Sequence, residues 1–289
     1  MYNWTMNQEL VRINTTDNIE QPGILYTPTT PTNKIVIHVH GLNGNFYENR
    51  FLDPLAKAYI KKGCAFLTFN NRGRDFISEL HQGTSYAVIG GSYERFKDCL
   101  MDIDGVVNWV KEKGFSEIIL EGHSYGCNKV LYYYNHRKDD IFKKIVLLAP
   151  CDIPSETKMF LGEEYDRVKT EATKCVEENK GRELLDYSIM ANGKIAAGTF
   201  YYDFLPGGEN DFLRYRDGAE AKNELLNEID IPVLVIFGDE DKCVLTQPAE
   251  TIKSYLANNI KNCDVEIIAG TGHSYRNKFD ELARIIENN

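Results

Sequence analysis

The chain has 289 residues, of which 43% are hydrophobic and 26% are charged. This length suits one large α/β domain, or a core domain with an insertion, and the composition is ordinary for a globular protein. The formal net charge of −10 at pH 7 argues against nucleic acid or an anionic membrane as the main partner.

The sequence also bears on the compartment of the protein. Residues 1–8 lack the basic region and apolar core of a signal peptide, and no apolar run approaches the roughly 20 residues that span a bilayer. Seven cysteines stand singly, without a CxxC pair, which indicates reduced thiols. Cys127 and Cys243 lie near motifs, but we interpret them as small buried apolar residues. We therefore expect a cytoplasmic protein without a membrane partner.

Strand-like and helix-like segments alternate along much of the chain. Short runs with strand character occur at 9–15, 24–27, 34–40, 64–69, 117–120, 144–149, 232–237 and 264–269. Helices are predicted at 47–62, 93–113, 125–137, 248–257 and 277–286. Residues 75–91 show no period and are predicted as an irregular loop near the site. The alternation predicts an α/β fold with a mainly parallel central sheet and helices on both faces.

The alternation is interrupted between residues 151 and 230. A connection between parallel strands needs only about a dozen residues, whereas this segment is much longer and is rich in Glu and Lys. Helices are predicted within it at 163–178 and 219–227. We therefore predict a core formed by 1–150 and 231–289, with 151–230 as an inserted, mostly helical cap.

Residues 122–126 (GHSYG) fit the pattern G-x-S-x-G. A predicted strand leads into the motif and a predicted helix leaves it, and in that context the motif marks a sharp turn. The glycines let strand and helix approach closely, while Ser124 takes a strained backbone conformation. Its hydroxyl then stands clear of the sheet, beside the positive end of a helix. A short pattern also occurs by chance, but this context favours Ser124 as a nucleophile.

A serine nucleophile needs a base, and the base needs an acid that orients it. Histidine suits the role of base because its free pKa lies near neutral pH. His273 follows the last predicted strand, at the sheet edge where catalytic groups gather in open α/β sheets. The acid should lie between serine and histidine in the chain. We favour Asp241, with Asp239 as the second candidate because a residue so close to the strand end more readily stabilises the turn.

The developing negative charge on the substrate requires two backbone N–H donors. Tyr125 follows the nucleophile, and Leu42 lies in the loop 40–44 (HGLNG) after an early predicted strand. We expect these two amides to form an oxyanion hole and His40 to orient the loop. The sequence has no HExxH, no GxGxxG after a strand and no P-loop lysine. We therefore expect no metal and no nucleotide cofactor.

From about residue 9 to its C-terminus, the chain resembles the α/β-hydrolase family. The motifs that carry the resemblance are HGLNG at 40–44, NNRGR at 70–74, GHSYG at 122–126, GDEDKCV at 238–244 and GTGHS at 270–274. A closer resemblance, to the group of fungal fusarinine C-type siderophore esterases and uncharacterised bacterial relatives, is carried by GHSYGCNKVLYYY at 122–134, LAPCDI at 148–153 and FLPGGENDF at 204–212. The resemblance implies a catalytic triad of Ser124, Asp241 and His273.

These observations predict a serine hydrolase that cleaves a carboxylic ester of a small or medium-sized organic molecule. An amide or peptide hydrolase with the same triad is one alternative, and a ligand-binding protein on a hydrolase scaffold is another, since fold does not fix function. Six aromatic residues are candidates for the substrate pocket, with ordinary packing as the alternative for each: Phe46, Tyr47, Tyr86, Phe200, Tyr201 and Tyr275.

Overall fold

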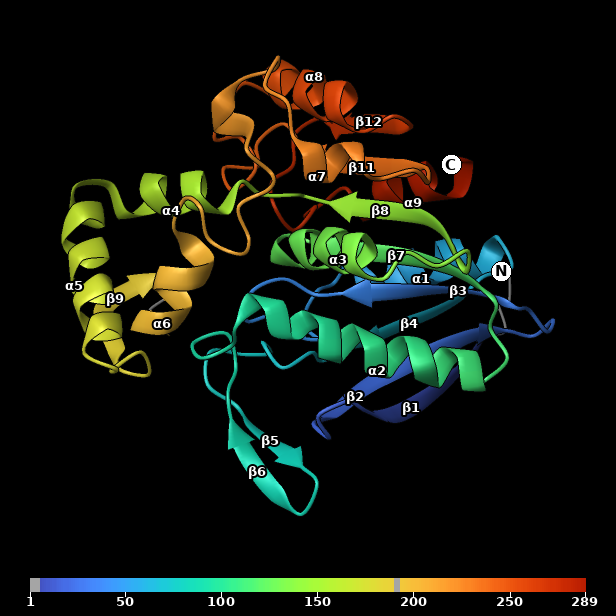
Figure 1. Ribbon diagram of the computed structural model, residues 1–289. Helices are drawn as coiled ribbons and strands as arrows, with labels where there is room; N and C mark the ends of the chain where they lie inside the picture. Colours follow the sequence, from blue (N-terminus) through green and yellow to red (C-terminus); the bar gives the residue numbers. More distant parts are fainter. Residues whose placement is uncertain (1–5, 190–192) are drawn as a thin grey trace.

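The computed structural model describes residues 6–189 and 193–289, built around one eight-stranded sheet (Figure 1). Residues 1–5, on which the expectation about a signal peptide partly rests, lie outside the described residues. The strand order is β1-β2-β4-β3-β7-β8-β11-β12. In chain order the strands are β1 (Met6–Asn14), β2 (Glu20–Pro28), β3 (Lys34–Val39), β4 (Ala65–Phe69), β7 (Glu117–His123), β8 (Phe142–Leu148), β11 (Val233–Gly238) and β12 (Cys263–Ile268).

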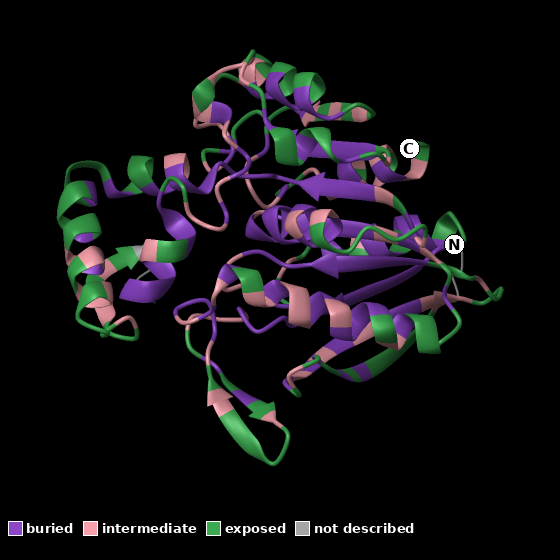
Figure 2. Cartoon of the chain, viewed as in Figure 1, coloured by how far each residue is buried: buried purple, intermediate pink, exposed green. Residues whose placement is uncertain are grey.

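The sheet is mainly parallel, as predicted. Within this sheet, β2 pairs antiparallel with both β1 and β4. The other neighbouring strands, in the order β4-β3-β7-β8-β11-β12, pair parallel. Every residue of β4 and of β11 is buried, because both faces of a parallel sheet are covered by other elements. Figure 2 shows this buried centre, with exposed residues gathered on the outer elements.

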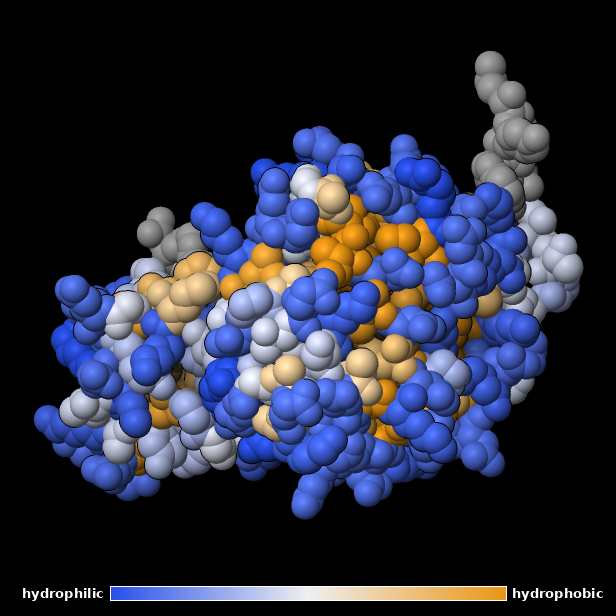
Figure 3. Space-filling view, turned by 90° about the horizontal axis from the view of Figure 1, so that it is seen from above, coloured by the Kyte–Doolittle hydropathy of each residue, from blue (hydrophilic) through white to orange (hydrophobic). Residues whose placement is uncertain are grey.

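Helices cover both faces of the sheet. Helices α1 and α9 contact each other, and α2 contacts α3 on the opposite face (Figure 1). The helices of this layer arrangement are α1 (Leu52–Lys61), α2 (Cys99–Glu112, after a 3₁₀ turn at Phe96–Asp98), α3 (Tyr125–His136), α8 (Ala249–Asn259) and α9 (Phe279–Asn288). The face seen from above is mainly hydrophilic, with apolar side chains showing between the polar ones (Figure 3). No helix in the described ranges is both long and apolar enough to cross a bilayer.

The prediction of an irregular loop over 75–91 is wrong in part. This stretch contains a hairpin of β5 (Glu79–Gln82) and β6 (Ser85–Val88), which projects from the body of the protein (Figure 1). Two residues join the strands, and the first, Gly83, has a φ of +59°. Such a positive φ is typical of two-residue hairpin loops. The strands lack clear apolar alternation, so periodicity did not reveal them.

The β8–β11 connection, as we call residues 151–230, lies for the most part beyond the carboxyl ends of the parallel strands, and its last residues run back beside the sheet (Figure 1). Its helices are α4 (Ile153–Leu161), α5 (Tyr165–Glu177), the short α6 (Ala197–Thr199) and α7 (Glu224–Asn227), with 3₁₀ turns at Gly162–Glu164 and Tyr215–Asp217. A π-helical turn, Phe200–Phe204, follows α6. A hairpin of β9 (Leu184–Ile189) and β10 (Gly193–Ala196) completes the set.

The predictions within this connection hold only in part. Helix α5 confirms the predicted helix over 163–178, but α4 was not predicted. Pro154 stands in its first turn, where proline is tolerated because the amide would have no intrahelical acceptor. The helix predicted over 219–227 is reduced to α7, because the side chain of Asn223 accepts hydrogen bonds from the amides of Leu225 and Leu226 and begins the helix at Glu224.

Candidate active site

Ser124 occupies the sharp turn between β7 and α3. Its φ of +57° and ψ of −127° are the strained conformation that the motif predicts. The Ser124 amide donates to the carbonyl of Leu148 at 2.8 Å, which ties the turn to the neighbouring strand. A Cβ at Gly126 would lie 2.1 Å from the Val39 carbonyl oxygen. Only glycine fits at that position, and α3 therefore starts directly against the end of β3.

Asp241 and His273 come together at the ends of β11 and β12. Nδ1 of His273 lies 2.9 Å from Oδ2 and 3.1 Å from Oδ1 of Asp241. The Asp241 carboxyl is fully buried, and Oδ1 also accepts from the amides of Cys243 (3.0 Å) and Val244 (3.3 Å). Because a carboxylate only accepts, Nδ1 is the protonated nitrogen and Nε2 keeps its lone pair.

Two opposing effects act on the pKa of His273. Burial lowers it, but the hydrogen bond that Nδ1 donates to Asp241 and the negative charge of that carboxylate outweigh burial, so that the pKa is raised above its ordinary value. The imidazolium form is therefore stabilised by its partner. This is the property required of a base that must hold a proton during a reaction cycle.

Asp239, the second candidate acid, has a different position. It is exposed, and its Oδ1 accepts from the amide of Gly270 at 2.7 Å. This hydrogen bond joins the end of β11 to the turn after β12. Among the described residues, Asp241 and not Asp239 bonds to His273.

His123, within the GHSYG turn, was not assigned a role from the sequence. Its Nε2 donates to the backbone carbonyl of His273 at 2.9 Å, and the two rings lie 4.9 Å apart. Burial holds the pKa of His123 well below its ordinary value, so the ring is neutral. His123 therefore fixes the loop that carries His273. Its place in the motif was a signal and indicates that the ring points away from Ser124, but spacing alone did not show what the ring contacts.

The loop 40–44 lies against Ser124. A Cβ at Gly41 would come within 2.9 Å of the Cβ of Ser124. His40 is buried, and burial together with the charge of Lys129 lowers its pKa to about 3. Nδ1 of His40 donates to the Gly41 carbonyl (2.8 Å), while Nε2 accepts from the Asn71 amide (3.0 Å). Since the Gly41 carbonyl and the Leu42 amide share one peptide plane, His40 orients the Leu42 amide.

Tyr125 contributes a backbone amide at the start of α3, where the N–H has no intrahelical acceptor. Its ring is buried, stacks on Phe204 with centroids 5.9 Å apart, and meets Phe96 at 5.5 Å. The Leu42 amide likewise donates to no other group in the ranges 6–189 and 193–289. Both amides are thus available beside Ser124.

A small cavity opens at Ser124 and leaves about 20 Å³ for the centre of a water molecule. That is room for about one water. The lining residues are Leu42, Ser124, Tyr125, Ile153, Glu156, Thr157, Phe160 and Phe204. The four from α4 stand at positions i, i+3, i+4 and i+7, so one face of this helix covers the nucleophile. Phe204 comes from the π-helical turn.

None of the six aromatic pocket candidates lines this cavity. Tyr275 is buried and donates its hydroxyl to the Ile236 carbonyl at 2.7 Å. Phe200 is buried in a stack with Phe204. Tyr86 is 57% exposed on the projecting β5–β6 hairpin. Two of these side chains are therefore held in the core, and the third lies on a hairpin away from the cavity, so aromatic character alone did not identify the pocket.

The other three candidates also lie elsewhere. Phe46 packs edge-on against Tyr47, which is 61% exposed. Tyr201 lines a separate hollow beside Tyr202 and Lys169. The aromatic walls of the Ser124 cavity are instead Phe160 and Phe204, whose segments carry no catalytic motif. They come near Ser124 only through the path of the β8–β11 connection.

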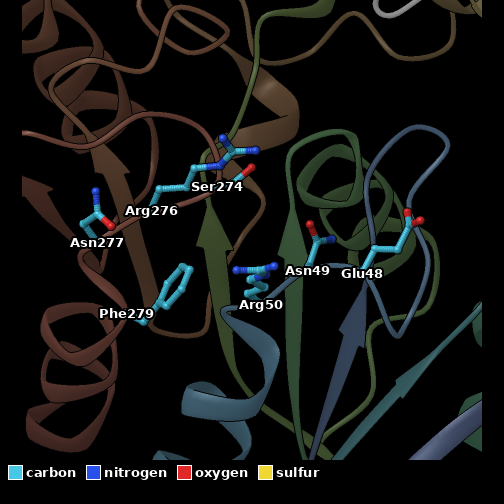
Figure 4. Close-up of a pocket in the computed structure, with 7 residues that line it drawn as sticks. All are labelled: Glu48, Asn49, Arg50, Ser274, Arg276, Asn277 and Phe279. Atoms are coloured by element: carbon cyan, nitrogen blue, oxygen red, sulfur yellow. The ribbon is translucent and has the colours of Figure 1, made fainter.

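A larger, polar hollow of about 430 Å³ is lined by Glu48, Asn49, Arg50, Ser274, Arg276, Asn277 and Phe279 (Figure 4). It lies between the segment that follows the loop 40–44 and the segment that follows His273. Figure 4 shows one arginine in each of these segments, Arg50 and Arg276, among the lining side chains. Ser124 does not line this hollow, so the small cavity is the candidate for the reacting part of a substrate.

Asp241, Cys243 and His273 each place one potential metal-ligating atom within 4.8 Å of the others. The Asp241 oxygens, however, already accept from His273 Nδ1 and from two backbone amides. A metal would have to replace the protonated Nδ1 of His273. The arrangement of donors fits a hydrogen-bonded acid and base better than a metal site.

The chain belongs to the alpha/beta hydrolase fold family, whose family model matches residues 34–275. No curated protein matches the chain. Among solved structures, Est1E from Butyrivibrio proteoclasticus with bound ferulic acid is similar over 96% of both chains, at 21% identity and a TM-score of 0.69. The Pyrococcus furiosus esterase Pf2001 is similar over 100% of this chain and 93% of its own, at 16% identity and a TM-score of 0.63.

A complex of DcsB with its substrate analogue is also similar, over 98% of this chain and 97% of that one, at 15% identity and a TM-score of 0.70. At these identities the likenesses establish the fold. They confirm the predicted α/β-hydrolase fold, whereas the closer resemblance to siderophore esterases stays a prediction.

Proposed function

We propose that the protein is a serine hydrolase that cleaves carboxylic esters of small or medium-sized organic molecules. The observation that carries the proposal is the 2.9 Å contact between His273 Nδ1 and buried Asp241, at the same sheet edge as the strained Ser124 turn. Nucleophile, acid and base then follow one another in the chain order of this family.

In the proposed reaction, Oγ of Ser124 attacks the ester carbonyl while Nε2 of His273 takes its proton. Asp241 holds Nδ1 and stabilises the imidazolium, and the Leu42 and Tyr125 amides bind the oxyanion. His273 then protonates the leaving alcohol. Water attacks the acyl-enzyme with His273 as base and releases the acid. We propose that the hydrogen bond from the Ser124 hydroxyl to Nε2 of His273 forms when substrate binds.

We propose that the β8–β11 connection acts as a cap. One face of α4 closes the cavity over Ser124, which leaves room for about one water, so a substrate enters only when α4 moves. The buried carboxylate of Asp152 begins α4 and accepts from Arg216 at 2.6 Å. This contact ties α4 to the end of the connection, and such gating segments often control substrate entry.

Esters are favoured over amides as substrates by the resemblance to siderophore esterases and by the esterases among the structural neighbours. We further propose that the protein acts in the cytoplasm on a small-molecule ester, without nucleic acid or membrane as partner and without a cofactor. All seven cysteines are free, which is consistent with a reducing compartment.

The test is hydrolysis of p-nitrophenyl esters of increasing acyl length, compared with aminoacyl p-nitroanilides. We expect ester turnover and labelling by a fluorophosphonate, with both abolished in Ser124→Ala. Faster turnover of the anilides would show an amide hydrolase instead. If the wild-type protein neither reacts with the fluorophosphonate nor turns over any of these substrates, the protein is a binding protein on this fold and the proposal is wrong.

A further inference from the structure

One acidic side chain, Glu156, lines the Ser124 cavity. It stands in the first turn of α4 and is half-buried. Its carboxyl lies against the thiols of Cys243 and Cys151, which are weak hydrogen-bond donors. In the described ranges no lysine, arginine or histidine forms an ion pair with Glu156. The carboxylate therefore lacks a full counter-charge in the free protein.

The groups that face Glu156 come from three loops. His273 follows β12, Asp241 and Cys243 follow β11, and Cys151 follows β8. Burial raises the pKa of Glu156, and the negative charge of Asp241 acts in the same direction. The charge of His273 and the hydrogen bonds of the two thiols lower the pKa, which is about 7. At neutral pH the group is therefore poised between its neutral and charged forms, and a cation brought beside it would stabilise the charged form.

The same cavity offers aromatic and apolar walls. Phe160 and Phe204 line it together with Leu42 and Ile153. The faces of aromatic rings attract ammonium groups, most strongly where water is excluded. Once α4 has moved to admit a substrate, as proposed above, this carboxylate and these aromatic rings are together complementary to a cation with apolar substituents.

We propose that the Ser124 cavity selects esters that carry an ammonium group a few bonds from the reacting carbonyl, with Glu156 as its counter-charge and Phe160 and Phe204 as its aromatic walls. The inference rests on the proposed esterase function and names the substrate class of that site. Glu156 is then the specificity-determining residue. Its position on α4 assigns substrate selection to the β8–β11 connection.

The test compares esters of equal shape that differ only in charge. Acetylcholine and 3,3-dimethylbutyl acetate place the difference on the alcohol. The p-nitrophenyl esters of 4-(trimethylammonio)butanoic and 5,5-dimethylhexanoic acid place it on the acyl group. We expect at least one pair to favour the cation about tenfold in kcat/KM at pH 8, and the ratio to fall at pH 6, where Glu156 is protonated. Titration of His273 affects both members of a pair and cancels in the ratio.

Glu156→Gln should bring this ratio close to one and remove its pH dependence. The matched control is Glu163→Gln, which removes the same charge from an exposed position outside the cavity and should keep the ratio. A role of Glu156 in structure alone would slow both esters of a pair equally and leave the ratio intact, which would overturn the proposal. If Glu156→Gln does not fold, the pH dependence of the wild-type ratio tests the proposal: a ratio that falls from pH 8 to pH 6 supports it, and a ratio that does not change overturns it.

Failure of this inference is distinguishable from failure of the esterase function. Hydrolysis of both esters without preference for the cation in either pair would refute the inference and leave the esterase intact. If neither ester of any pair is hydrolysed, the esterase proposal fails. Calorimetric titration of the Ser124→Ala protein with acetylcholine and 3,3-dimethylbutyl acetate then decides the inference: tighter binding of the cation supports it, and equal or absent binding overturns it.

Discussion

The cavity at Ser124 has two walls of different origin. One wall is the edge of the sheet, where the loop after β3 and the turn after β7 supply Leu42, Ser124 and Tyr125. Asp241 and His273 stand at the same edge, after β11 and β12. The other wall is the β8–β11 connection, where one face of α4 supplies Ile153, Glu156, Thr157 and Phe160. The sheet edge fixes its groups through strained backbone and buried hydrogen bonds, whereas the connection contributes side chains from one surface helix. We infer that the edge carries the chemistry and the connection carries selectivity.

The largest expected effect lies at the sheet edge. Ser124→Ala removes the nucleophile, and kcat for a p-nitrophenyl ester should fall about 10⁴-fold or more. A continuous assay of p-nitrophenol release measures kcat, and the thermal unfolding midpoint of the variant is the control for folding. A loss of less than tenfold would show that the sheet edge does not carry the reaction.

The next effect separates the two aspartates of the same edge. Asp241→Asn places an NH2 donor where a carboxylate oxygen accepts from His273, which favours the wrong tautomer, so kcat should fall about 10³- to 10⁴-fold. Asp239→Asn alters only a turn hydrogen bond to Gly270 and should change kcat by no more than about threefold. The opposite order would exchange their roles.

The sheet edge also depends on buried charge beneath it. Lys129 of α3 and Glu94 form a fully buried ion pair at 2.7 Å. Lys129→Met leaves the Glu94 carboxyl uncompensated and should lower the free energy of unfolding by about 3–5 kcal/mol, measured by urea denaturation at pH 7. The control is Lys111→Met at the exposed Lys111–Asp139 pair, which should cost less than about 1 kcal/mol. Equal losses would contradict the special role of the buried pair.

The connection should respond differently to mutation. Phe160→Ala removes an aromatic wall of the cavity and should raise KM for aromatic esters several-fold while kcat stays within about twofold, because a binding contact common to ground and transition states is lost. Met159→Ala truncates an equally exposed neighbour that does not line the cavity and should leave KM unchanged. A large fall in kcat for Phe160→Ala would contradict the inference that the connection carries selectivity and not chemistry.

The smallest effect is on pH dependence. The base must be neutral in the free enzyme, so kcat/KM should rise with pH through the pKa of His273, which Asp241 holds above its ordinary value. Asp241→Asn removes the negative charge and should move the midpoint of this rise to lower pH, in the residual activity measured between pH 4 and 9. A midpoint that stays in place would show that another group sets the acid limb.

The two walls also differ in how far the sequence predicted them. Ser124 and His273 stand directly after predicted strands, and parallel topology brings such ends to one edge. His40 was expected to orient its loop, and its hydrogen bonds to Gly41 and Asn71 agree with that expectation.

The wall from the connection escaped prediction for a physical reason. Pro154 hid the start of α4, although Asp152 caps it, so the helix face that carries Glu156 and Phe160 had no recognisable signal. The aromatic candidates failed similarly. Tyr275 is near His273 in the chain, but its hydroxyl is buried against Ile236. Loops at strand ends are constrained by topology, while the path of a long connection depends on tertiary contacts that periodicity does not reveal.

The proposed reaction passes through an acyl-enzyme on Ser124. Rapid mixing with a p-nitrophenyl ester, acid quench and intact-mass spectrometry test it most directly. We predict a mass increase equal to one acyl group, which peptide mapping locates to Ser124 and which is absent from Ser124→Ala. In a variant that hydrolyses the acyl-enzyme slowly, the steady-state amount of acylated protein should be larger. Turnover with an acyl group on another residue, or turnover that persists in Ser124→Ala, would contradict the account.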